Sequence, residues 1–259
     1  MEREIPAHDI LALAARKTRY CVCIPVINEG DRIRTQLREM LPMASVADII
    51  IADGGSTDGS TAESELRSAG VRALLVKRGP GRLGAQLRMG FAYALDQGYD
   101  GVVLMDGNGK DDPEAIPRFI GALEAGGDFV QGSRFLPGGE AVRNPASRLL
   151  GIRLLHAPLI SWSAGVRYTD TTNGFRAYSS RFLADPRVAL FRDLFAGYEL
   201  HYYLSIKAGQ LGFNVKEIPV RRIYPKEGKT PTKISFFKGN FDVMRCLLRA
   251  CLNRYDQRT

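Results

Sequence analysis

The stretch VVLMDGNGKDDP, residues 102–113, decides how this chain is organised. Its apolar beginning is typical of a buried strand, and it breaks abruptly into carboxylates, an amide and two glycines. Such groups at the carboxyl end of a parallel strand suit a metal-bound phosphate, because Mg²⁺ and Mn²⁺ prefer hard oxygen ligands and glycines let a ligand approach closely. Taken alone, the stretch fits a solvated turn that caps a helix equally well. The segments around it are therefore needed to distinguish a phosphate site from such a turn.

Apolar segments of strand length recur along the first half of the chain, and helical patterns separate them. We expect strands at residues 20–26, 49–52, 73–76, 101–105 and 129–131. Alternating strands and helices predict right-handed βαβ units, and therefore an α/β fold with a doubly wound, mostly parallel sheet and helices on both faces. Ligands bind at the carboxyl ends of such strands, where these polar residues should gather: Asn28, Asp53, Asp58, Arg82 and Asp106.

The bulk composition limits the classes of partner. The 259 residues carry a net charge of +8, which favours an anionic partner such as a nucleotide, a nucleic acid or an anionic lipid surface. No recognition-helix or zinc-finger pattern supports nucleic-acid binding, so we expect no nucleic acid partner. The 4 cysteines are too few for a disulfide framework and include no C-x-x-C pair, so we expect buried reduced thiols.

Two segments raise the question of a membrane. The sequence shows neither a secretory signal nor an apolar run of about 20 residues, so we expect a cytoplasmic protein, with peripheral attachment to the inner face of a membrane left open. Residues 235–255 have the pattern of an amphipathic helix with basic side chains around an apolar stripe. Such a helix either lies on an anionic membrane or packs against the core, and the apolar segment 149–162 poses the same alternative.

Six short motifs follow one another along the chain: IPVINE at 24–29, DGGSTDGS at 53–60, DGN at 106–108, GSR at 132–134, DTTNGFR at 170–176 and YEL at 198–200. Together they resemble the family 2 glycosyltransferases of the GT-A fold, nearest to the dolichyl-phosphate mannose synthase-like branch, over about residues 20–233. The resemblance implies a GT-A domain at residues 1–234, with a nucleotide half at about 18–135 and an acceptor half at about 136–234. The amphipathic helix and tail at 235–259 follow it.

The resemblance places four side chains around the nucleotide: Pro25, Asn28, Glu29 and Asp53. Asp53 would accept hydrogen bonds from the base or the ribose, although Asn28 and Asp53 also suit the start of a helix. The family usually has a second carboxylate where this chain has Gly54, so the base stays open between GDP-linked and UDP-linked sugars. Arg82 either faces the diphosphate or is an exposed loop arginine, and Asp106 completes the nucleotide set.

Asp106 and Asn108 fall on the family's metal-binding Asp-x-Asp motif, which implies a divalent ion, Mg²⁺ or Mn²⁺. Asparagine still offers an amide oxygen to a hard cation, but it carries no charge and should weaken the site. Related synthases often place a further polar ligand where this chain has Lys110, whose ammonium would neutralise the diphosphate directly. Asp111 and Asp112 have the pattern of a cap for the following helix.

Two carboxylates are candidates for catalysis. Asp170 lies in the segment that borders donor sugar and acceptor in the family, where it would contact sugar or act as a base; a turn-forming aspartate is the alternative. Glu199 either matches the acid/base group of many family members or simply begins a helix. Phosphate or acceptor contacts are implied for basic residues, because a guanidinium matches phosphate oxygens, with surface salt bridges as the alternative. These residues are Lys110, Arg134, Arg176, Arg222, Lys229 and Lys233.

The implied reaction is transfer of a sugar from a nucleotide-diphosphate sugar to an acceptor, with inversion at the anomeric carbon. Basic groups and the divalent ion would stabilise charge on the departing diphosphate. The acceptor is either a polyprenyl phosphate, which is already ionised, or a membrane-linked saccharide, whose hydroxyl would need Asp170 or Glu199 as base. The alternatives are a sugar nucleotidyltransferase, disfavoured because no early Gly-x-Gly-Thr-Arg loop is present, and a non-catalytic nucleotide-sugar-binding protein.

Overall fold

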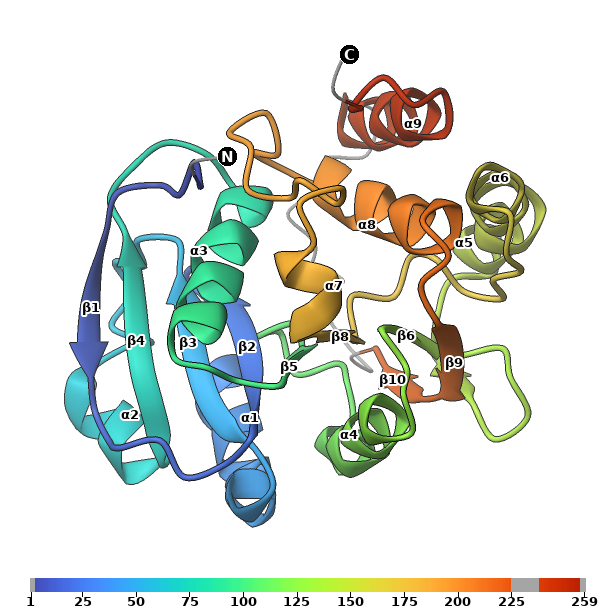
Figure 1. The fold of residues 1–259 in the computed structure, drawn as a ribbon. Coiled ribbons are helices and arrows are strands. Elements are labelled where there is room, and N and C mark those ends of the chain that lie inside the picture. The colour runs from blue at the N-terminus through green and yellow to red at the C-terminus, as the bar shows by residue number, and fades with distance from the viewer. Residues whose placement is uncertain (1–2, 225–237, 257–259) are drawn as a thin grey trace.

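The computed structural model describes residues 3–224 and 238–256 of the chain. Its centre is a sheet of 8 strands in the order β1-β4-β3-β2-β5-β8-β6-β9 (Figure 1). The bounds of these strands are His8–Ala12 (β1), Tyr20–Val26 (β2), Asp48–Asp53 (β3), Val71–Lys77 (β4), Gly101–Leu104 (β5), Phe129–Ser133 (β6), Arg176–Ser179 (β8) and Val215–Pro219 (β9). Two short strands, β7 (Glu140–Val142) and β10 (Arg221–Ile223), pair separately in parallel.

Helices cover both faces of the sheet. The first face carries α1 (Asp31–Glu39), α2 (Glu63–Ser68) and α4 (Ile116–Glu124). The opposite face carries α3 (Leu83–Asp96), α6 (Ala157–Ala164), α7 (Ser180–Ala184), α8 (Glu199–Gln210) and α9 (Lys238–Cys251). The remaining elements are α5 (Ala146–Gly151), a π-helix at Ile152–His156, and 3₁₀ turns at Leu41–Ser45 and Pro113–Ala115. Each face has its own hydrophobic core, as expected for a doubly wound sheet.

The sequence-based expectation of a mostly parallel sheet is confirmed. β4, β3, β2 and β5 are parallel neighbours, and so are β6 and β9, while β1 and β8 run antiparallel to the strands beside them. The pattern did not indicate β1, which is an edge strand with mostly exposed side chains, or β8, which is only four residues long and begins with an arginine. Both lack the continuous apolar run that marks a buried parallel strand.

Alternating side chains of β2 pack into the two cores. Cys21 and Cys23 belong to the core beneath α3, whereas Val22 and Ile24 belong to the core beneath α1. This is the two-residue period of a strand covered on both faces. The described cysteines are all free thiols, as expected from their number and spacing.

The C-terminal helix α9 shares the core of the second face. Leu247, Ala250 and Cys251 are buried there against α6 and α8, and Ser163 Oγ donates to Cys251 O at 3.1 Å. Opposite these residues, Phe241 and Leu252 are exposed. The core-packing alternative for this amphipathic segment is therefore confirmed on one side of the helix, and the membrane alternative stays a prediction. None of the helices in residues 3–224 and 238–256 is long and apolar enough to cross a membrane.

Candidate functional site

A cavity of about 1620 Å³ lies at the edge of the sheet where β2, β3 and β5 end. Its wall includes nine of the residues that the sequence indicated: Pro25, Glu29, Arg82, Asp106, Asn108, Lys110, Arg134, Glu199 and Arg222. Four other candidates do not line it: Asn28, which is exposed, and the buried Asp53, Asp170 and Arg176. Lys229 and Lys233 fall outside the described residues. The ends of three parallel strands thus bring together side chains that are far apart in the chain.

Asp53 and Asn28 brace the loops that form the cavity wall. The buried Asp53 carboxylate accepts hydrogen bonds from the Ser56 backbone at 3.0 Å and from the Ser56 hydroxyl at 2.6 Å. Asn28, at φ 49°, accepts a 2.8 Å hydrogen bond from the Thr57 backbone, and its own N–H donates to Ser56 Oγ at 3.0 Å. Neither residue is the N-cap of α1 or α2. Asn28 therefore joins the loop after β2 to the loop after β3, and Asp53 stabilises the loop after β3 from within.

Gln86 is a wall residue that the motifs did not indicate. Its buried Nε2 donates to Val26 O at 2.8 Å and to Ala52 O at 2.7 Å, so it holds the ends of β2 and β3 together. A Cβ added at Gly54 would lie 3.1 Å from this Nε2. The second carboxylate that the family usually carries at this position would therefore require Gln86 and Ile27 to shift. A polar side chain in the mostly apolar first half of α3 was the available signal.

Asp106 forms an ion pair with Arg222 at the floor of the cavity. Arg222 Nη2 donates to Asp106 Oδ2 at 2.8 Å, and Arg222 Nη1 contacts the buried Asp111 carboxylate. The Arg222 side chain is 7% exposed and that of Asp106 is 25% exposed. The expected helix cap is made by Asp112, whose Oδ1 accepts from the Glu114 backbone at 3.0 Å. Asp111 does not share this role, because its carboxylate turns inward to the arginine.

Asn108 and Lys110 complete the loop after β5. Asn108 Nδ2 lies 3.4 Å from Asp106 Oδ2, and its Oδ1 accepts a 3.3 Å hydrogen bond from the Lys110 backbone. The buried Lys110 ammonium lies 5.2 Å from the centre of the Tyr224 ring. The loop is anchored to α1 by a 2.9 Å hydrogen bond from Gly109 N to Gln36 Oε1. One carboxylate, one amide and one ammonium are thus held at the cavity wall.

Burial and the neighbouring charges shift the pKa values of three groups in and beside this network: Asp106, Asp111 and His201. Burial raises the pKa of Asp106, but the Arg222 guanidinium, together with Lys110 and His201, more than offsets burial and lowers this pKa below its ordinary value. The pKa of Asp111 is raised, because burial there outweighs the same guanidinium. Burial, together with the positive charge of Arg176, lowers the pKa of His201 to about 3, so this imidazole is neutral at physiological pH. Asp106 is therefore ionised and paired with the Arg222 guanidinium.

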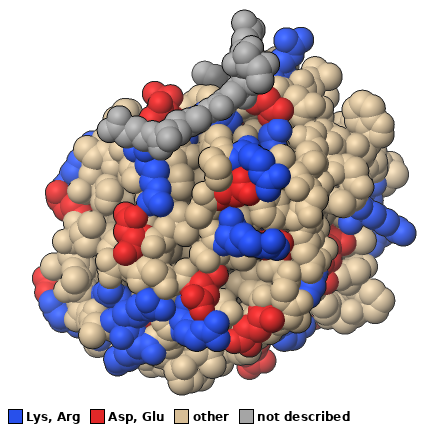
Figure 2. Space-filling model, viewed as in Figure 1, with Lys and Arg blue, Asp and Glu red and all other residues tan. Residues whose placement is uncertain are grey.

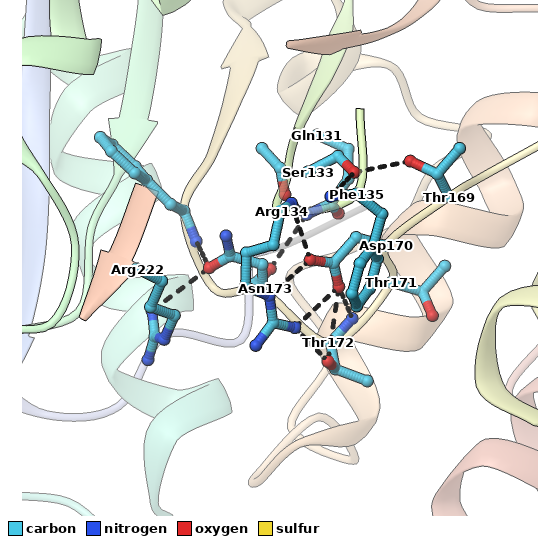
Figure 3. A network of polar contacts seen from close by, with 12 residues as sticks. Gln131, Ser133, Arg134, Phe135, Thr169, Asp170, Thr171, Thr172, Asn173 and Arg222 are labelled. Carbon is cyan, nitrogen blue, oxygen red and sulfur yellow. Dashed lines mark hydrogen bonds and ion pairs between the residues drawn. The ribbon is translucent and has the colours of Figure 1, made fainter. Parts of the chain in front are cut away.

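Asp170 and Arg134 form a buried ion pair (Figure 3). Arg134 Nε donates to Asp170 Oδ2 at 2.7 Å, and Arg134 Nη2 donates to Asp170 Oδ1 at 2.9 Å and to Thr172 Oγ1 at 2.8 Å. Arg134 lines the cavity, whereas the Asp170 side chain is 0% exposed. Burial raises the pKa of Asp170, but the arginine lowers it below the usual range. This carboxylate has no direct access to a sugar or an acceptor in this structure.

Arg176 is buried and links two segments of the backbone. Its guanidinium is buried and donates to the carbonyls of Asn173, His201 and Thr171 at 3.0, 2.8 and 2.8 Å. It thereby joins the 171–173 turn to α8. Neither of the two expected roles, phosphate contact or surface salt bridge, matches this position, because backbone carbonyls occupy the guanidinium.

Glu199 begins α8, as one of its two interpretations predicted, and also lines the cavity. Its Oε1 accepts a 2.7 Å hydrogen bond from the Gly197 backbone. Further basic side chains line the cavity from α9 and the turn after it: Arg245, Arg249 and Arg254. The sequence showed these arginines on an amphipathic helix but did not indicate that they face the site. On the face shown in Figure 2, basic side chains form several groups separated by acidic and uncharged ones.

A sequence model described as glycosyl transferase family 2 matches residues 21–196, which is more than half of the chain. The chain belongs to glycosyltransferase family 2. It is therefore an enzyme that uses a nucleotide sugar, and the sequence-based hypothesis of glycosyl transfer is confirmed over nucleotidyl transfer and over binding alone.

Two relatives are similar to this family 2 glycosyltransferase over most of its length. The undecaprenyl-phosphate mannosyltransferase of Micrococcus luteus is 29% identical, covering 82% of this chain and 86% of the relative. The polyprenol monophosphomannose synthase of Mycolicibacterium smegmatis is 31% identical, covering 85% of this chain and 83% of the relative. These relatives support the predicted dolichyl-phosphate mannose synthase-like branch.

Solved structures confirm the predicted GT-A fold. The glucosyl-3-phosphoglycerate synthase of Mycobacterium tuberculosis in complex with UDP superposes with a TM-score of 0.62 at 19% identity, covering 90% of this chain and 79% of that one. The same enzyme in complex with Mn²⁺, UDP and phosphoglyceric acid gives a TM-score of 0.61. At this level of identity the likeness concerns the fold.

The residues of this family 2 glycosyltransferase fit a divalent ion that the donor helps to hold. Asp106 and Asn108 offer a carboxylate and an amide oxygen, which are ligands that Mg²⁺ and Mn²⁺ accept, and part of Asp106 is exposed to the cavity. No group of three or more His, Cys, Asp or Glu suited to a metal occurs in the described part of the chain. Diphosphate oxygens and water would complete the shell, and the ion would offset charge on the departing diphosphate.

We predict that Asp170→Asn lowers the free energy of unfolding by about 3–5 kcal/mol at pH 7, because it leaves the buried Arg134 without its counter-ion. The pKa of Asp170 is lower in the folded state, so the ion pair contributes fully above the unfolded pKa of about 4 and less as the pH falls through the folded pKa. In urea unfolding, the difference between wild type and variant should be constant down to about pH 4 and shrink below it.

Asp185→Asn is the matched control. Asp185 pairs with Arg187 at 2.7 Å, but that arginine is 61% exposed, so the change should cost less than about 1 kcal/mol. Equal losses in the two variants, or a difference for Asp170→Asn that does not depend on pH below 4, would contradict the proposed role of the buried pair.

Proposed function

We propose that this enzyme transfers a sugar from a GDP- or UDP-linked donor to a polyprenyl phosphate, with inversion and with the help of Mg²⁺ or Mn²⁺. The observation that carries the proposal is the shared cavity, in which Asp106 lies among the cations Lys110, Arg134 and Arg222 beside the loops after β2 and β3. A diphosphate needs such cations, and the printed names of both relatives describe transfer of mannose to polyprenyl carriers.

The donor is proposed to lie with its nucleoside against the loops after β2 and β3. Pro25, Glu29 and Gly54 line this part of the cavity, with Asp53 behind them as a brace. Its diphosphate would then reach Asp106 and Asn108, with the exposed Arg82 on the α3 side. This order follows the strand ends from β3 through β2 to β5, so the sugar would point toward Arg134 and α8.

The acceptor is proposed to be a phosphate, because the site offers cations more readily than a free base. Asp170 is enclosed with Arg134, so we propose that it positions the arginine rather than removing a proton. A polyprenyl phosphate is already ionised near neutral pH and needs little help from a base. Glu199 is the remaining carboxylate candidate at the cavity should the acceptor be a saccharide hydroxyl.

An exposed apolar surface is proposed to bring the enzyme to the membrane that carries this acceptor. It consists of large side chains on two packed parts of the fold, the 146–164 segment and α9 with the turn that follows it. These side chains are 60 to 78% exposed: Leu150, Leu154, Trp162, Phe241 and Leu252. The same α9 lines the cavity with arginines, so a bilayer at this surface would lie next to the site. We propose that residues 1–234 form the transferase domain and that 235–259 add to this membrane-facing side, on the cytoplasmic face.

We predict transfer of sugar to undecaprenyl phosphate in lipid vesicles, with release of a nucleoside diphosphate. A panel of GDP- and UDP-linked sugars, with Mn²⁺ or Mg²⁺, would be assayed for radiolabelled lipid. Asp106→Asn should lower kcat/KM at least about 100-fold, because the carboxylate that would hold the ion against the diphosphate loses its charge. Asp112→Asn is the matched control: it makes the same change in the same loop, and asparagine also caps helices.

Transfer to free saccharides with none to the lipid would contradict the proposed acceptor. Binding of donor without any turnover would contradict the proposed reaction, and equal activity of the two variants would contradict the role of Asp106.

We predict that the wild-type protein sediments with vesicles containing anionic lipid and that Leu154→Ser/Trp162→Ser weakens this binding at least about tenfold, because two large apolar side chains no longer enter the lipid. Ile10→Ser on the edge strand β1 also removes an exposed apolar side chain, 54% exposed, and should leave binding unchanged. Equal binding of all three proteins would exclude this surface as the membrane contact.

A further inference from the structure

Arg222 is held in place by the backbone around it. Its strand β10 pairs in parallel with β7, Ile223 N donates to Lys110 O at 2.8 Å, and Arg222 forms a bridge with Asp111. These backbone contacts place Arg222 beside the loop after β5, within reach of Asp106. The fold fastens the segment that carries Arg222 directly to the loop that carries the Asp106 carboxylate.

The guanidinium lies between two carboxylates of different kinds. The Asp111 side chain is 0% exposed, and no described residue bonds its Oδ2, so Asp111 depends on Arg222 for compensation. Asp106 is partly exposed to the cavity, and its Oδ2 accepts from Arg222. Both oxygens lie close to Gly174, where an added Cβ would approach Oδ1 to 2.8 Å and Oδ2 to 3.2 Å. The carboxylate thus has little free space on the Gly174 side, and Arg222 already occupies Oδ2.

A divalent ion and a guanidinium compete for the oxygen atoms of such a carboxylate. Both are cations that need the oxygen lone pairs, and like charges a few ångströms apart repel each other. The second motif position adds no charge, because it is Asn108, and the Lys110 ammonium stands on the same loop. Apart from Asp106 itself, the floor of the cavity carries three cations, Lys110, Arg134 and Arg222, against two carboxylates, Asp111 and Asp170. The surroundings of Asp106 therefore carry net positive charge before any ion arrives.

We infer that Arg222 and the divalent ion are alternative partners of Asp106, so that Arg222 keeps the affinity of the donor-free enzyme for metal low. The ion then binds tightly only together with the donor, whose diphosphate supplies oxygens and negative charge. This inference rests on the proposed donor site and adds to it a residue that regulates the metal. It also gives Arg222 a role beyond neutralising phosphate.

The test is a titration of the donor-free protein with Mn²⁺ alone, in which electron paramagnetic resonance measures the free ion. Arg222→Gln/Asp111→Asn removes the guanidinium and also the buried carboxylate that would be left without a partner. This variant should bind Mn²⁺ at least about tenfold more tightly than wild type. Arg222→Lys keeps a cation and should stay near wild type. Arg221→Gln is the matched control, because Arg221 is 51% exposed and pairs with Glu140.

Equal Mn²⁺ affinity of wild type and the double variant, with both proteins folded by circular dichroism, would overturn the inference. If the double variant fails to fold, Arg222→Met with Asp111→Leu replaces the buried pair by apolar groups and carries the same expectation. Nucleoside diphosphate binding, measured separately by calorimetry with Mn²⁺ present, tests the donor site itself. Its loss in all proteins would contradict the proposed function, whereas the metal titration decides the role of Arg222.

Discussion

Buried ion pairs between segments that are distant in sequence hold the floor of this cavity together. Arg134 and Asp170 are 36 residues apart, and Arg222 and Asp106 are 116 residues apart. A charge taken out of water is stable only beside its counter-ion, so each pair fixes the relative position of two loops. The sheet brings the strand ends to a common edge, and the ion pairs then determine which side chains face the donor.

The formal charges of this floor are balanced before a donor binds. Lys110, Arg134 and Arg222 face Asp106, Asp111 and Asp170, three cations against three carboxylates. A diphosphate adds negative charge that this network does not already compensate. This additional negative charge has to be compensated by cations around the floor, which are Arg82, the arginines of α9 and a divalent ion. Binding of donor, ion and the proposed phosphate acceptor would in this way depend on one another electrostatically.

Local patterns predicted the strands and the chemistry of their ends, because apolar runs and polar breaks are short-range features. Residues 20–26 form β2, and the loop with Asp106 and Asn108 lines the cavity. Such patterns do not indicate which distant residue pairs with each charged side chain. Nothing near Asp170 shows that Arg134 encloses it, and nothing near Arg176 shows that backbone carbonyls surround it. Gln86 was missed for the same reason, since its partners are backbone atoms of two other strands.

The most direct test of this account is a crystal structure of the enzyme with a nucleoside diphosphate and Mn²⁺. The account predicts that the diphosphate lies over the strand end of β5, with the ion between its oxygens and Asp106 and with Arg222 moved away from Asp106 Oδ2. A diphosphate bound elsewhere, with the Arg222–Asp106 pair intact at the 2.8 Å seen here, would contradict it.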